Sequence, residues 1–216
     1  MIKMSTLFKI EYTEDRTIIL PEIREENLWV INDPTTVASI KRDGTASLLH
    51  ETAGWCRRYD AKKFTKNKKT GKRNEWNRPI PDGFIPAQPD CDPVTGHWPG
   101  WLPLQEKQDK WVFEAVEKGE TLHGQEFIVG QTYECCGPKI NSNHEGLGSH
   151  WMFQHGTEVL DSVPSFDRTI FDPLFFYLDE MRIYLQNLEH EGIVFNNAEG
   201  KMCKLRRKDF GLKWPL

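Results

Sequence analysis

The sequence has no apolar run long enough to cross a membrane, and its cysteines form no paired motif. A membrane helix needs about 20 consecutive apolar residues, and none of that length occurs in the chain. The N-terminal stretch MIKMSTLFKIEYTED has too short an apolar segment for a signal peptide. The five cysteines include no C-x-x-C pair, which argues against a disulfide framework and against structural zinc. We therefore expect a soluble cytoplasmic protein without a membrane partner.

The composition is that of a folded globular protein. Hydrophobic residues make up 38% of the chain and aromatic residues 12%, which excludes a disordered chain. A chain of 216 residues can bury a sizeable core. We expect residues 1–216 to form a single domain.

Positive charge is concentrated in two segments although the net charge is −4. Residues 57–78 contain ten Lys or Arg against Asp60 and Glu75, and residues 201–213 contain six against Asp209. The rest of the chain is therefore strongly acidic. Basic segments with interleaved aromatics, here Tyr59, Phe64 and Trp76, favour contact with nucleic-acid phosphates and bases. A solvated basic loop without a partner is the alternative.

The chain has three informative groups of predicted elements. Residues 35–41 and 45–51 predict two strands joined by the turn RDG, and residues 131–137 a third strand. Residues 108–120 predict a helix that stops at Gly119, and residues 171–192 a helix with Asp172 as N-cap and Pro173 in its first turn. The proline-rich residues 78–103 predict a packed surface loop.

The C-terminal part predicts a β-hairpin around the turn NNAEG. With a turn centred near Asn197, Glu191 would lie opposite Lys204 or a residue beside it. Side chains alternate along a strand, so Lys204 and Arg206 share one face. The hairpin can thus present one carboxylate and two cations to the same space, and a plain cross-strand salt bridge is the alternative.

One short motif directs the functional interpretation. Lys41, Asp43 and Gly44 form K-x-D-G directly after a predicted strand. Alone the motif is weak, because it occurs by chance. Here a strand with Glu134, then E-G-I-V from Glu191, then K-L-R from Lys204 follow it in order.

This ordered set resembles the motifs of the covalent nucleotidyltransferase superfamily, which includes polynucleotide ligases and capping enzymes. Further blocks are similar to a small stand-alone ATP-dependent 5′-to-3′ RNA ligase family, and they cover the chain from about residue 28 to its end. They are TVASIKRDGTA, RRYDAK, GFIPA, GHWPGWLP, TYECCGPKINSNHEGLGSH, HG at His155 and Gly156, EGIVF and KLRRKDFGLKWP. The resemblance implies an α+β adenylation domain with two mainly antiparallel sheets, flanking helices and a nucleotide cleft between the sheets.

The resemblance also implies roles for individual residues. Lys41 would be the nucleophile that takes up AMP from ATP, a reaction that needs an uncharged amine. Mg²⁺ or Mn²⁺ would be held by Asp43, Glu134 and Glu191. Residues around the nucleotide would be Ile40, Asp43, Gly44, Arg58, Glu134, Lys204 and Arg206. Arg57 is the alternative to Arg58, and Gly44 would adopt a backbone conformation that other residues resist.

The implied reaction is RNA ligation. AMP would pass from Lys41 to an RNA 5′-phosphate, and an RNA 3′-hydroxyl would displace it. The partner is therefore RNA with such ends, in repair or splicing, and the protein is expected to be a monomer. Trp151 or Phe153 could stack on adenine, although core packing is favoured for both.

Two departures from related enzymes matter. DNA ligases and capping enzymes usually have arginine where Ala46 stands, which favours an RNA ligase and shifts that arginine's role to Arg58. The chain ends ten residues after Arg206, so no OB-fold domain is expected. A DNA ligase, a GTP-dependent capping-type enzyme and a non-catalytic RNA-binding module of the same fold stay open as alternatives.

Overall fold

The computed structural model describes residues 4–13, 17–66, 70–75, 79–93 and 95–216. These residues form two compact units. Unit 1 contains Gly44–Gln154, and unit 2 contains Met4–Asp43 and His155–Leu216. The chain therefore passes from unit 2 to unit 1 inside the K-x-D-G motif. The mixed α+β composition predicted from the sequence is confirmed, whereas a single adenylation domain stays a prediction.

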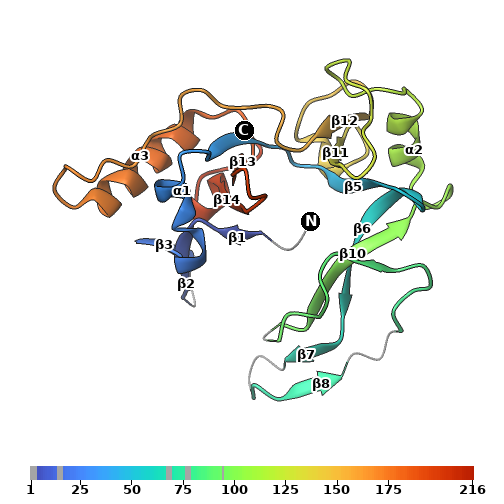
Figure 1. The fold of residues 1–216 in the computed structure, drawn as a ribbon, viewed down its shortest axis with the longest axis horizontal. Coiled ribbons are helices and arrows are strands. Elements are labelled where there is room, and N and C mark those ends of the chain that lie inside the picture. Colours follow the sequence, from blue (N-terminus) through green and yellow to red (C-terminus); the bar gives the residue numbers. More distant parts are fainter. Residues whose placement is uncertain (1–3, 14–16, 67–69, 76–78, 94) are drawn as a thin grey trace. The chain divides into compact units, whose positions relative to one another are not determined.

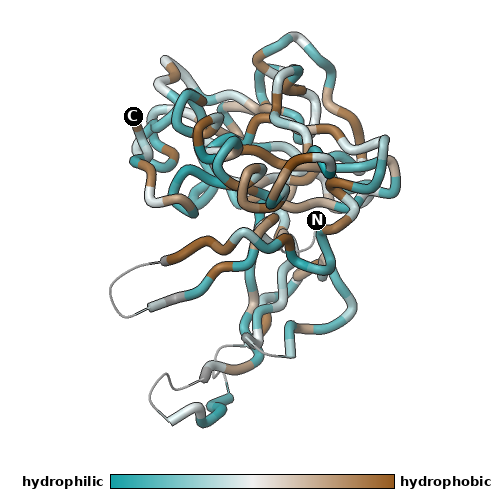
Figure 2. Tube along the Cα trace, turned by 90° about the vertical axis from the view of Figure 1, so that its left-hand side faces the viewer, coloured by the Kyte–Doolittle hydropathy of each residue, from teal (hydrophilic) through white to brown (hydrophobic). Residues whose placement is uncertain are grey.

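Unit 2 is built on a four-stranded sheet in which only one pair of strands is parallel. The strands in sheet order are β1 (Ser5–Thr6), β14 (Met202–Arg206), β13 (Gly192–Asn196) and β4 (Val37–Lys41), and β1 pairs with β14 in parallel (Figure 1). A separate hairpin joins β2 (Phe8–Tyr12) and β3 (Thr17–Ile23). The Ile-Ile-Leu run of β3 appears brown in Figure 2. A short helix α1 (Trp29–Asn32) precedes β4.

The long helix of unit 2, α3 (Pro173–Asn187), begins as predicted but ends at Asn187 rather than near residue 192 (orange in Figure 1). The Asp172 carboxylate accepts a hydrogen bond from the Phe175 amide at 3.3 Å, which caps the first turn. Apolar side chains recur along α3 at helical spacing and pack into the core, where Met181 and Leu185 are fully buried. They meet Ile193 and Leu205 from the sheet in one cluster, so α3 covers one face of that sheet.

Unit 1 is built on a six-stranded antiparallel sheet. The strands in sheet order are β12 (Trp151–Gln154), β11 (Thr132–Cys136), β5 (Thr45–His50), β6 (Gly54–Lys62), β10 (His97–Pro103) and β9 (Ile85–Pro86). The helix α2 (Lys110–Val116) packs Val112 and Ala115 against Tyr133 and Met152, and so covers one face of this sheet. A small hairpin of β7 (Phe64–Lys66) and β8 (Arg73–Glu75) follows β6.

The prediction of a loop over the proline-rich residues 78–103 is wrong for two segments, because β9 and the seven-residue β10 lie there. The carbonyl of Pro99 accepts a hydrogen bond from the Ala87 amide at 2.9 Å. In an antiparallel ladder a residue's N–H and C=O point to the same neighbour. The missing N–H of Pro99 therefore points to the side of the very short β9 rather than to β6, where it interrupts little pairing.

The C-terminal hairpin forms, but with another register than predicted. Gly192 pairs with Arg206 and Val194 with Lys204, so Glu191 does not lie opposite Lys204. The connection spans residues 197–201, in which the Asn197 side chain accepts from the Lys201 amide at 2.9 Å. Gly200 adopts a positive φ of 76° there. The longer connection shifts the pairing of the strands.

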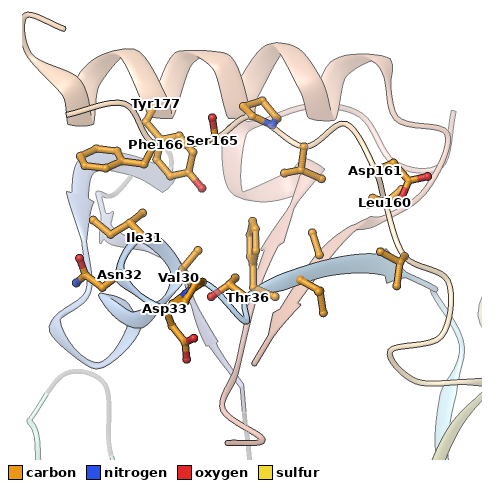
Figure 3. Close-up of a pocket in the computed structure, with 17 residues that line it drawn as sticks. Val30, Ile31, Asn32, Asp33, Thr36, Leu160, Asp161, Ser165, Phe166 and Tyr177 are labelled. Carbon is orange, nitrogen blue, oxygen red and sulfur yellow. The ribbon is translucent and has the colours of Figure 1, made fainter. Parts of the chain in front are cut away.

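A cavity of about 540 Å³ opens in unit 2 between α1, the start of β4 and residues 159–166. Figure 3 shows the rings of Phe166 and Tyr177 on one side and the side chains of Val30 and Ile31 on the other. None of the residues predicted for the functional site lines this cavity. In the described part of the chain no helix has the length and apolar character needed to span a membrane.

Candidate functional site

The polar face of the unit 2 sheet brings the predicted nucleophile and two predicted cations together. Gly192, on the central strand β13, pairs with Lys41 on one side and with Arg206 on the other. Directly paired residues point to the same face of a sheet, so Lys41 and Arg206 share a face. Lys204 lies two residues before Arg206 on β14 and therefore shares it too. The opposite face carries Ile193 and is buried against α3.

Glu191 supplies the negative charge at this place. It immediately precedes β13, and its carboxylate forms an ion pair with the Lys41 ammonium. The two side chains are 19% and 10% exposed, so the pair is largely withdrawn from water. The predicted gathering of one carboxylate with cations is thus present in unit 2, although the hairpin register behind it differs.

The electrostatics of the face are dominated by positive charge. Burial, and next the nearby charges of Arg206 and Lys41, lower the pKa of Lys204 to about 8. Asp209 and Glu191 act in the opposite direction and offset part of this effect. Asp209 is buried and binds the Arg206 guanidinium at 2.7 Å. The positive potential that lowers the pKa of Lys204 also favours the binding of an anion on this face.

The residues next to Lys41 are also held in unit 2. Arg42 binds the Glu158 carboxylate, with a distance of 2.9 Å from Nε to Oε2. Asp43 accepts a hydrogen bond from the Trp214 indole N–H at 2.8 Å. Ile40, predicted near the nucleotide, pairs with Ile193, and its amide donates to the Glu158 carbonyl at 2.9 Å.

Gly44 and Glu134 are linked in unit 1. The Gly44 amide donates to the Glu134 carboxylate at 3.1 Å, and the Asn141 amide group donates to the Gly44 carbonyl at 2.8 Å. A Cβ at Gly44 would lie 2.3 Å from the Cys135 carbonyl oxygen, far inside contact distance. The predicted reason for this glycine is wrong, because Gly44 is not among the residues with positive φ. Close approach to β11 requires it instead.

The two neighbouring arginines of β6 lie on opposite faces of the unit 1 sheet. The register places Arg58, Ala46 and Glu134 on one face. Arg58 stacks over Trp101, with 5.4 Å between its guanidinium carbon and the ring centroid. Arg57 points to the α2 side, where its Nε lies 3.3 Å from Asp109. Arg58, not Arg57, therefore shares a face with Glu134.

The basic residues 57–78 form strands rather than a loop over much of their length. Lys63 lies over Trp98 at 4.3 Å, and Lys72 and Arg73 are exposed. Phe64 is fully buried beneath Arg73, so its predicted stacking on bases is wrong. Trp76 lies outside the described residues.

The prediction that Phe153 packs in the core is confirmed. Its side chain is 2% exposed, and the residue pairs with Glu134 in the sheet. Trp151 is partly exposed, and the Lys118 ammonium lies 4.4 Å from the centre of its ring.

The predicted metal ligands are divided between the two units. Asp43 and Glu191 belong to unit 2, and Glu134 to unit 1. Across the ranges that the structure describes, no three His, Cys, Asp or Glu side chains gather closely enough to hold a metal ion by themselves. Mg²⁺ is commonly bound through one or two carboxylates together with substrate phosphates. Asp43 and Glu191 are carboxylates suited to a site of this type, in which substrate phosphates supply the remaining ligands.

Sequence reasoning missed Glu158, Asp209 and Trp214. Trp214 and Asp209 lie in the block KLRRKDFGLKWP, which was noted without a role for either. Asp209 stands three residues after Arg206, a spacing that brings side chains together in one helical turn. Glu158 lies in an irregular segment, and nothing in its sequence context signals its role.

Comparison with known proteins identifies relatives of this chain. A family model described as RNA ligase 1 matches residues 122–216. RNA ligase 1 of Mus musculus is 30% identical over 192 residues, covering 72% of this chain and 57% of the relative. The chain is thus similar to RNA ligase 1 proteins. RNA ligase 1 of Rattus norvegicus has the same identity and coverage, and that of Danio rerio is 28% identical.

The resemblance to RNA ligases predicted from the sequence is thus confirmed. The chain spans 57% of the length of these curated RNA ligase 1 proteins. The region matched by the RNA ligase 1 family model contains Glu134, Glu191, Lys204 and Arg206, whereas Lys41 precedes it.

Proposed function

We propose that this protein is an ATP-dependent RNA ligase that acts through AMP bound covalently to Lys41. The observation that carries the proposal is the polar face of the unit 2 sheet. Lys41, Lys204 and Arg206 lie there together, next to the Glu191 carboxylate. A nucleophile among cations is the arrangement that attack on a phosphate requires. The relationship to RNA ligases supports RNA as the substrate.

In the first step the Lys41 Nζ attacks the α-phosphorus of ATP. The Lys41 ammonium first gives one proton to the Glu191 carboxylate that contacts it, because only the uncharged amine can attack. The N–P bond then forms as the bond from phosphorus to the pyrophosphate oxygen breaks, and Nζ loses its second proton to solvent. Lys204 and Arg206 would stabilise negative charge that develops on the phosphate oxygens, an effect typically worth several kcal/mol.

In the later steps AMP would be transferred to RNA. An oxygen of the RNA 5′-phosphate attacks the AMP phosphorus, and the bond to Lys41 breaks. The RNA 3′-hydroxyl then attacks the activated 5′-phosphate, a phosphodiester forms, and AMP leaves. The exposed cations of β6 to β8, such as Lys72 and Arg73, are suited to hold the RNA backbone.

The residues of unit 2 fit a triphosphate and a divalent metal ion. Three cations on one face suit a polyanion, and Asp43 and Glu191 would hold Mg²⁺ or Mn²⁺ together with phosphate oxygens. The metal ion would supply charge neutralisation for the leaving pyrophosphate. The roles of Ile40, Gly44, Arg58 and Glu134 toward the nucleotide stay predictions.

The proposal is tested by intact-mass spectrometry after incubation with ATP and Mg²⁺. We expect the wild-type protein to gain the mass of AMP and to lose it when 5′-phosphorylated RNA is added. Lys41→Ala should gain no mass, and Lys201→Ala, which changes an exposed lysine of the same hairpin, should behave as the wild type. AMP uptake by Lys41→Ala would show that Lys41 is not the nucleophile.

The same assay separates the alternatives. Uptake of GMP from GTP in place of AMP would indicate a capping-type enzyme. Discharge on nicked DNA but not on RNA would indicate a DNA ligase. A protein that binds RNA with a steep dependence on salt but never gains mass would be a non-catalytic RNA-binding module.

A further inference from the structure

Three consecutive side chains at the end of β4 are each held by a different segment of unit 2. Lys41 pairs with Glu191 at the start of β13. Arg42 pairs with Glu158, and Asp43 accepts a hydrogen bond from Trp214. The first contact belongs to the proposed nucleophile, whereas the partners in the other two, Glu158 and Trp214, have no role assigned so far.

The contact between Arg42 and Glu158 is bidentate and sheltered. Nε donates to Oε2 at 2.9 Å, and Nη2 contacts Oε1. The two side chains are only 14% and 15% exposed. Paired, charge-assisted hydrogen bonds of this kind fix the orientation of a guanidinium more strongly than a single bond.

Glu158 is itself fixed by the backbone around it. Its carbonyl accepts from the Ile40 amide at 2.9 Å, and the Leu160 amide donates to the Ala38 carbonyl at 2.9 Å. Ser39 and Val159 form an antiparallel bridge between these hydrogen bonds. The segment around Glu158 thus runs along the outer edge of β4, so the carboxylate is attached to the strand whose end it holds.

Trp214 is fixed by a buried arginine. The Arg207 guanidinium, 4% exposed, donates to the Lys213 carbonyl at 2.8 Å. It also donates to carbonyl groups at the end of α3, including that of Leu188 at 2.7 Å. The residue before Trp214 is therefore tied to the core of unit 2, and the indole N–H is directed at Asp43 from a fixed position.

We propose that Glu158 and Trp214 are positioning residues that hold the turn of Lys41, Arg42 and Asp43 in the geometry needed for attack on the α-phosphate. This inference rests on the proposed function. Reaction rates are steeply sensitive to the placement of a nucleophile, because a misplacement of about 1 Å can cost about 100-fold. Both residues act through their neighbours and contact no reacting atom, so their removal should slow the chemical step rather than weaken ATP binding.

The test measures single-turnover transfer of AMP to Lys41 at a range of ATP concentrations. Glu158→Gln keeps the shape of the side chain but removes its charge, and Trp214→Phe keeps a ring but removes the N–H donor. The matched control is Glu199→Gln, which breaks an exposed ion pair with Lys201 in the same unit. Folding of each variant is verified by circular dichroism at the assay temperature.

We expect the maximal rate of AMP transfer to fall about tenfold or more in each test variant, with little change in the ATP concentration for half-maximal rate. Glu199→Gln should match the wild type. Arg42→Lys, which keeps the charge but not the bidentate geometry, should fall between the wild type and Glu158→Gln. A merely structural role would lower the unfolding temperature and leave the rate of folded protein unchanged.

Two results would overturn the inference: wild-type rates in both folded variants, or a raised half-maximal ATP concentration with an unchanged maximal rate. A wild-type protein that takes up no AMP would instead refute the proposed function, and the inference with it.

Discussion

Replacing Lys204 by Met is expected to stabilise the protein at neutral pH while it impairs the proposed reaction. Burial and the charges of Arg206 and Lys41 lower the pKa of Lys204 from 10.5 to about 8. A pKa shift of one unit corresponds to a free-energy difference of about 1.36 kcal/mol. The whole shift would amount to about 3 kcal/mol, but the side chain is only partly buried, so solvent screening reduces the expected gain to about 1–2 kcal/mol.

The sign of the effect follows from proton binding. Lys204 loses its proton at a lower pH in the folded than in the unfolded protein. Between about pH 8 and pH 10.5 the unfolded chain therefore binds more protons, and the stability of the wild type rises with pH across this window. Below about pH 8 Lys204 is protonated in both the folded and the unfolded protein, so the buried charge lowers the free energy of unfolding by its full amount. Lys204→Met removes that cost.

The assay is urea unfolding at several pH values. The free energy of unfolding of Lys204→Met should exceed that of the wild type at pH 7, and the difference should shrink as the pH rises from 8 to 10.5. Lys201→Met is the control, because Lys201 is exposed and a hydrogen bond from its ammonium to Glu199 raises its pKa. That variant should gain no stability.

AMP uptake gives the second half of this prediction. Lys204→Met should transfer AMP to Lys41 far more slowly, because a cation opposite the phosphate is lost. A variant that is less stable than the wild type at pH 7 would refute the reasoning, since it would mean that the charge of Lys204 is fully compensated in the folded protein.

Two further predictions concern unit 1. Gly44→Ala should lower the free energy of urea unfolding by about 1–3 kcal/mol, because its Cβ would meet the Cys135 carbonyl at 2.3 Å; Gly148→Ala, with no atom within 4 Å, is the control, and equal losses in both variants would contradict the steric argument. Alanine at both Lys72 and Arg73 should reduce the salt dependence of RNA binding by up to about 2 in its log–log slope, as measured by fluorescence anisotropy against Lys107→Ala, and an unchanged slope would show that these cations do not contact RNA.

Local sequence signals were reliable where a single element decides the structure. The cap at Asp172 and the strands on either side of the RDG turn formed as predicted. Each depends on nearest neighbours and on hydrophobic periodicity. The same signals failed for β10, because the tolerance of Pro99 depends on which neighbouring strand its missing N–H faces.

The surroundings of individual side chains could not be predicted without the tertiary structure. Phe64 lies in a basic segment and was expected to be available for stacking, yet it is fully buried, with Arg73 over its ring. Glu158 approaches Arg42 from 116 residues away in the sequence. Contacts of this kind depend on the path of an irregular segment, for which the sequence carries no periodic signal.

The hairpin shows why an incorrect register still left the cations of unit 2 together. The prediction placed Glu191 opposite Lys204 or a residue beside it, whereas Gly192 pairs with Arg206, a shift of two or three residues. Lys204 and Arg206 share a face in either register, because residues two apart on one strand point to the same side of a sheet. What the observed register adds is the position of Gly192, directly between Lys41 and Arg206 in the row of paired residues. A Cβ at this position would lie 2.2 Å from the Leu205 carbonyl oxygen, so only glycine fits in the central strand between the residues that carry these two cations.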